Sequence, residues 1–105
     1  MMRALSISAI DNYRKNAKQH ADIDLDVLKI RINCLVDACE TSKNSLRGKI
    51  YQFGKCVITV NDMNIITDIK WTDEKARPSN HEVGKLKHLY KVRGLNSQGS
   101  AFLNK

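Results

Sequence analysis

Three short apolar segments follow one another between residues 48 and 71, and they constrain the fold more than any other part of the chain. Residues 54–55 and 61–64 separate them, and these connections contain glycine, asparagine or aspartate, which favour tight turns. Strands joined by such short connections pair in opposite directions. The sequence therefore predicts an antiparallel meander. Its strands are residues 50–53, 56–60 and 65–71.

The clearest helix precedes the meander, over residues 25–39. Its apolar side chains recur at spacings of three and four residues, which places them on one face of a helix. Asp24 is a good N-cap for this helix, and Asp26 suits the positive end of its dipole. Residues 41–45 are expected to end it. Because its apolar face is wide, we expect this helix to be the most buried element.

A shorter helix is predicted near the N-terminus, over residues 9–20, because Ile10, Tyr13 and Ala17 follow helical spacing. Residues 3–8 alternate between apolar and polar types, so a first strand there is an alternative.

Residues 83–93 fit two structures. As a strand, they would turn Leu86 and Tyr90 inward and a row of basic side chains outward. As a helix, they would pack the same two side chains and distribute the lysines around the rim. Gly84 and the alternating pattern favour the strand.

Together these elements predict an α+β fold, with two N-terminal helices packed on one face of a three- or four-stranded antiparallel sheet. The 105 residues suffice for one domain with a modest core. We expect a helical part over residues 9–44, a sheet part over residues 48–93 and a flexible tail over residues 94–105. The chain has no run of about 18 apolar residues, so no contact with a membrane is expected.

Positive charge is concentrated in the second half of the chain. Up to Ser45, seven Lys or Arg residues face six Asp or Glu residues, whereas from Leu46 onward eleven face five. The net charge of +7 is thus divided into +1 and +6. A small basic sheet domain is typical of proteins that bind an anionic partner, and nucleic acid is the commonest.

The cysteines give no sign of a metal site. Cys34, Cys39 and Cys56 form no CxxC or CxxH pair, so we expect reduced, partly buried thiols in a cytoplasmic protein, with no metal and no cofactor. The chain also contains no Walker loop, GxGxxG, GxSxG or HExxH motif. These absences argue against nucleotide hydrolysis, dinucleotide-dependent chemistry and zinc-protease activity.

The hairpin over residues 54–69 has a distinctive order of residue types. A glycine and a basic residue precede an apolar run, a polar turn and a closing strand with a threonine, namely GKCVITV, ND and IITDI. Lys18 and His20 lie upstream. This pattern resembles the small ribonuclease toxins of the barnase–EndoU–colicin–RelE superfamily. The resemblance implies a metal-independent ribonuclease that a cognate acidic inhibitor restrains.

RNA cleavage without a metal needs a base, an acid and cations that stabilise the phosphorane. His20 is the first catalytic candidate because histidine titrates near neutral pH and Lys18 lies beside it. Lys49 is the second, since it follows Gly48, where the backbone can approach a phosphate closely. Thr67 is the third, because its hydroxyl could contact a phosphate from the closing strand.

The basic row within residues 83–93 is the firmest binding feature, although such a charge run is often only a solvated face. The predicted nucleic-acid-binding residues are Arg47, Lys85, Lys87, Lys91 and Arg93. The expected partner is RNA or another nucleic acid. The alternative to a ribonuclease is a non-catalytic phage- or plasmid-type accessory protein, which binds nucleic acid or an acidic host protein and inhibits its function. A structural, oligomer-forming domain is a third interpretation.

Overall fold

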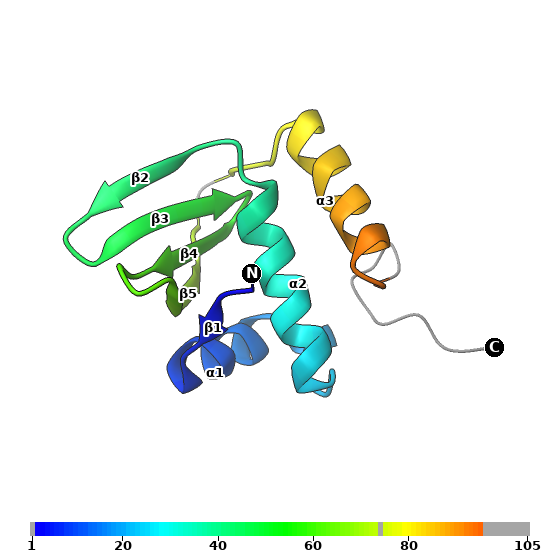
Figure 1. Cartoon of the computed structure of the whole chain (residues 1–105), viewed down its shortest axis with the longest axis horizontal. Helices are drawn as coiled ribbons and strands as arrows, with labels where there is room; N and C mark the ends of the chain where they lie inside the picture. The colour runs from blue at the N-terminus through cyan, green and yellow to red at the C-terminus, as the bar shows by residue number, and fades with distance from the viewer. Residues whose placement is uncertain (1, 74, 96–105) are drawn as a thin grey trace.

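The computed structural model describes residues 2–73 and 75–95, and these ranges form an α+β fold (Figure 1). The strands are β1 (Ala4–Leu5), β2 (Ser42–Ser45), β3 (Gly48–Phe53), β4 (Cys56–Val60) and β5 (Ile65–Trp71). The helices are α1 (Ile7–Asn16), the 3-10 helix η1 (Lys18–His20), α2 (Leu25–Ala38) and α3 (Asn80–Val92).

The described strands form one mixed sheet in the order β1-β5-β4-β3-β2. The predicted meander is confirmed: β3, β4 and β5 pair antiparallel, and Ile58 lies between Tyr51 and Ile69. However, β1 pairs parallel with β5, so the prediction of a purely antiparallel sheet was wrong. Parallel pairing joins segments far apart in the chain, and no local turn signal announces it.

The edge strand β2 occupies residues that were expected only to end the long helix. It pairs antiparallel with β3, and Ser42 lies beside Tyr51. All four of its residues are exposed. An edge strand held by backbone hydrogen bonds needs no apolar alternation, and the polar sequence SKNS therefore carries no strand signal.

Residues 83–93 belong to helix α3 and its C-cap, so the preference for a strand was wrong. A capping box begins the helix: the Ser79 side chain accepts a hydrogen bond from the Glu82 backbone, and the Glu82 side chain accepts one from the Ser79 backbone. Leu86, Leu89 and Tyr90 then lie on the side that packs against α2. Gly84 lies on the solvent side, where it costs some helix propensity without breaking the helix.

The N-terminal helices agree in part with the prediction. α1 begins at Ile7 because the Ser6 hydroxyl accepts a hydrogen bond from Ala9 N at 3.1 Å. It ends at Asn16, and η1 continues the chain to His20. α2 follows the predicted span closely, with Asp24 as its N-cap.

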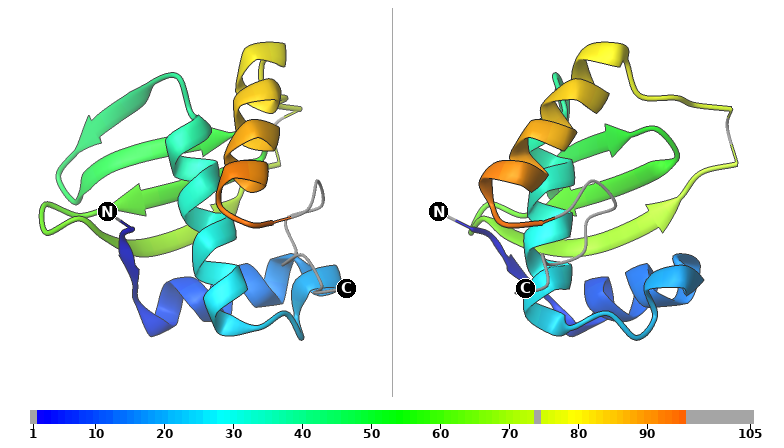
Figure 2. Two further views of the ribbon diagram at one scale, coloured as in Figure 1. Left: turned by 45° about the vertical axis from the view of Figure 1, so that its right-hand side comes forward. Right: turned by 90° about the vertical axis from the view of Figure 1, so that its right-hand side faces the viewer.

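α2 is the middle layer of the molecule, between the sheet and α3 (Figure 2). On one side, Leu28 and Ile32 pack with Ile58 and Ile69 from the sheet. On the other side, Cys34 packs with Tyr90 of α3 and with Leu95, which follows α3. The apolar face of α2 therefore serves two clusters, which explains why this helix is the most buried.

The second cluster also includes Leu95, which falls within the predicted flexible tail. Leu95 is 1% exposed, and its N–H donates to Tyr90 O at 2.7 Å. Residues 96–105 of the expected tail lie outside the described residues.

The opposite face of the sheet carries no helix within the described ranges (Figure 2). Strand pairing places Ile50, Thr59 and Asp68 side by side on this face, since their neighbours along each strand point into the core. We name this surface the open sheet face. Its other members are Lys43, Gln52, Val57 and Lys70.

Candidate nucleic-acid interface

The solvent side of α3 is basic, and we name it the α3 basic face. Its members are the exposed residues His81, Lys85, Lys87, His88 and Lys91. At 3.6 residues per turn, these positions fall within an arc of about 160° around the helix axis. Three of the five predicted nucleic-acid-binding residues thus lie on one surface, although a helix and not a strand presents them.

The single carboxylate of α3 lies outside this face and is engaged elsewhere. Glu82 accepts hydrogen bonds from the backbone N–H groups of Ser79 and Glu40, each at 3.0 Å. Burial acts to raise the pKa of Glu82, but these hydrogen bonds outweigh it and lower the pKa. Glu82 therefore ties the start of α3 to the end of α2, and the α3 basic face contains no acidic side chain.

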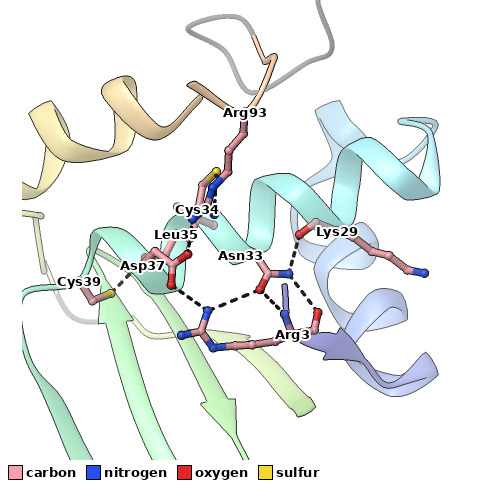
Figure 3. A network of polar contacts seen from close by, with 8 residues as sticks. All are labelled: Arg3, Lys29, Asn33, Cys34, Leu35, Asp37, Cys39 and Arg93. Carbon is pink, nitrogen blue, oxygen red and sulfur yellow. Dashed lines mark hydrogen bonds and ion pairs between the residues drawn. The ribbon is translucent and has the colours of Figure 1, made fainter. Parts of the chain in front are cut away.

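Arg93 leaves the predicted basic row and enters a network between α3, α2 and β1 (Figure 3). Its Nη2 lies 2.6 Å from Asp37 Oδ2, while Arg3 Nη1 lies 2.8 Å from Asp37 Oδ1. Burial acts to raise the pKa of Asp37, but hydrogen bonds from Arg93 and Arg3 outweigh it and lower the pKa. Arg93 therefore stabilises the packing of α3 and is a poor candidate for a phosphate contact.

Asn33 explains how the two-residue strand β1 is held. Its side chain is fully buried, accepts a hydrogen bond from Arg3 N at 2.7 Å and donates one to Arg3 O at 3.1 Å. The amide thus pairs with the backbone as a neighbouring strand would (Figure 3). Sequence reasoning missed this residue; an asparagine within the apolar face of the long helix was the available signal.

His20 belongs to a hydrogen-bonded cluster that joins η1, α1 and α2. Arg31 Nε donates to Tyr13 Oη at 2.5 Å, and Tyr13 Oη lies 3.3 Å from His20 Nδ1. The His20 and Tyr13 rings are stacked with centroids 6.2 Å apart. Burial and the nearby charge of Arg31 lower the pKa of His20, which favours the neutral imidazole.

The three catalytic candidates lie in separate places. Tyr13, the partner of His20, packs against Trp71 at the last residue of β5. Lys49 is exposed near the start of β3. It lies beside Val60 of β4, and Val60 lies beside Ile66 near the start of β5, at the end of that strand opposite Trp71. Thr67 lies next to the bulge near that end, and its carbonyl accepts a hydrogen bond from Ser6 Oγ at 3.2 Å. The structure therefore separates His20 from the other two candidates, whereas Lys49 and Thr67 lie at the same end of the sheet, on strands that β4 separates.

Arg47, the remaining binding candidate, lies far from α3 along the chain and on another surface. It is exposed in the turn between β2 and β3, and it lines a shallow groove together with Thr59 and Lys70 of the open sheet face. It therefore does not extend the α3 basic face.

Metal sites and membrane spans are absent from the described ranges. No group of three or more His, Cys, Asp or Glu side chains there could hold a metal ion. No described helix is long and apolar enough to cross a bilayer. Burial raises the pKa values of Cys39 and Cys56 to about 12, which leaves both as poor nucleophiles.

Comparison of the chain with protein-family models, curated proteins and solved structures finds no match. The resemblance to ribonuclease toxins therefore remains a prediction, and the candidate interface rests on the geometry of the chain itself.

Proposed function

We propose that this protein binds nucleic acid through the α3 basic face, by contacts to the phosphate backbone and without catalysis. The observation that carries the proposal is the grouping of Lys85, Lys87 and Lys91 with two histidines on one exposed helical surface that contains no carboxylate. Lys85 and Lys91 lie about 9 Å apart along the helix axis, so a run of phosphates can contact several side chains at once.

The proposal favours binding over cleavage because of how the polar residues are distributed. A metal-independent ribonuclease needs its base, acid and cations within reach of one phosphate. His20 is engaged with Tyr13, whereas Lys49 is near the other end of the sheet. Of the functions that the sequence allows, the non-catalytic nucleic-acid-binding accessory protein fits this arrangement best.

The test is a triple variant, Lys85→Gln, Lys87→Gln and Lys91→Gln, assayed by fluorescence anisotropy on short labelled RNA and duplex DNA over a salt series. Each lost phosphate contact reduces the slope of log K against log salt by about 0.7 for single strands and about 0.9 for duplexes. We therefore expect the slope to fall by about 2 for single-stranded RNA and about 3 for duplex DNA, equally for all sequences.

The matched control removes the same charge elsewhere. Lys15, Lys18 and Lys55 are exposed and lie outside the α3 basic face, so their replacement by Gln should change affinity much less. An equal loss in both triple variants would contradict the proposal. Absence of binding at moderate salt would also contradict it and would favour an acidic protein partner. RNA cleavage that survives EDTA and disappears in His20→Ala would establish catalysis instead.

A further inference from the structure

The open sheet face presents a second basic surface. One shallow groove lies on it, and a second extends from Ile50 and Gln52 to the loop at Arg77 and to Glu82 at the start of α3. Arg47 and Lys70 line one groove, and Lys43 and Arg77 line the other. All four cations are exposed, and in the part of the chain that the structure describes none forms an ion pair.

The carboxylates at these grooves are already engaged. Asp68 accepts a hydrogen bond from Asn12 Nδ2 at 3.2 Å. Glu82, at the rim of the second groove, accepts the backbone hydrogen bonds that fix the start of α3. The grooves therefore have four cations and two carboxylates, and both carboxylates already accept hydrogen bonds within the protein. This excess of positive charge suits an anionic partner.

The shape and chemistry of the surface indicate which anion fits. Lys43 and Lys70 lie on strands β2 and β5, which are separated by about 14 Å at the usual strand spacing. Between these strands the face offers the exposed side chain of Gln52 and the half-buried side chains of Ile50 and Val57, while Thr59 is 9% exposed and no aromatic ring is present. A shallowly grooved surface with dispersed cations and no stacking platform suits a phosphate backbone and does not select bases.

The open sheet face and the α3 basic face point in opposite directions, because the sheet and α2 lie between them (Figure 2). We propose that the open sheet face binds a second nucleic-acid segment, so that one molecule bridges two segments. This inference rests on the proposed function of the α3 basic face. The bridging activity follows because two separate basic surfaces, on opposite sides of the sheet and α2, allow one molecule to bind two segments at once.

The test uses one oligonucleotide immobilised on beads and a second, labelled oligonucleotide in solution, with the full chain present below saturation. Wild type should capture the labelled strand on the beads. The sheet variant Lys43→Gln, Arg47→Gln, Lys70→Gln should keep binding to one oligonucleotide but lose at least about 80% of the capture. The α3 triple variant should also lose capture. The Lys15, Lys18, Lys55 triple variant should retain it, and urea unfolding of each variant checks its fold.

The outcomes separate this inference from the proposed function. If wild type binds one oligonucleotide through α3 but captures no second strand, the bridging inference fails and the proposed function stands. If the α3 triple variant captures the labelled strand as well as wild type, the α3 basic face is not needed, and the proposed function fails and with it the inference. Capture that persists in the sheet variant would indicate a dimer that uses two α3 basic faces, which also overturns the inference.

Discussion

At the scale of single residues, several buried or half-buried polar side chains connect separate elements, although no sequence motif singles them out. Asn33 holds β1, and Asp37 joins two arginines from opposite ends of the chain. Arg31 extends the same pattern: it donates to Tyr13 and lies over the Tyr90 ring at 5.7 Å. These side chains are partly or fully buried, so each needs its partners for the fold to be stable.

His20 should make stability depend on pH. Its pKa is lowered in the folded state, first by burial and then by Arg31, so the unfolded chain binds the proton more readily. By linkage, the contribution of His20 is fully present above its unfolded pKa of about 6.5 and is lost as the pH falls through its folded pKa. We expect His20→Gln to flatten the pH dependence of the free energy of unfolding between about pH 5 and pH 7, measured by urea denaturation.

The control is His81→Gln, which removes an exposed histidine from α3. The change that it produces is the reference against which the effect of His20→Gln is compared. If His20→Gln changes the pH dependence no more than His81→Gln does, the packing of His20 against Tyr13 does not affect its titration.

At the scale of elements, the meander and α2 follow local signals, whereas β2 does not, and α3 carries conflicting local signals. Gly54 in the turn has a φ of 60°, a conformation that glycine favours, so the residue type itself predicts the turn. β2 has only exposed polar side chains, and its strand geometry comes from pairing with β3. α3 has an alternating sequence, yet the capping box at Ser79 and packing on α2 select the helix. The sequence therefore predicted a basic surface that contains Lys85, Lys87 and Lys91, but it placed these residues on a strand instead of a helix.

Two glycine substitutions should have opposite effects. Gly48 has a φ of +124°, and a Cβ there would meet Val60 O, so Gly48→Ala should destabilise the protein by at least about 2 kcal/mol. Gly84 lies in α3 with open space around its Cα, so Gly84→Ala should stabilise the protein by about 0.5 to 1 kcal/mol. Urea unfolding measures both effects. Shifts of the same sign would contradict either the strain expected at Gly48 or the gain in helix propensity expected at Gly84.

At the scale of the whole molecule, the layers differ in how many of their residues are buried. Seven residues of α2 are buried, including Leu28, Ile32 and Val36, because this helix packs on both the sheet and α3. In α3 only Tyr90 is fully buried. The outer helix therefore depends on α2, whereas α2 and the sheet share a larger core. This order places the α3 basic face on the least buried layer.

Native-state hydrogen exchange should reveal this difference. We expect the amides of α3 to exchange through openings that leave α2 and β4 protected, since few apolar contacts hold α3 in place. Gly84→Ala should raise the opening free energies of α3 and of β4 by the same amount, because β4 opens only in states in which α3 is already open. Equal opening free energies for α3 and β4 would mean that the three layers unfold as one unit.

The amino-acid sequence by itself determined the meander, α2 and the excess of positive charge after residue 45, because turn residues, apolar periodicity and charge act over a few neighbouring positions. Only the tertiary structure decided that β1 pairs parallel with β5, that Arg93 pairs with Asp37, and that His20 lies away from Lys49. These features depend on contacts between segments far apart in the chain. The energy of such contacts cannot be derived from either segment alone, so no local pattern encodes them.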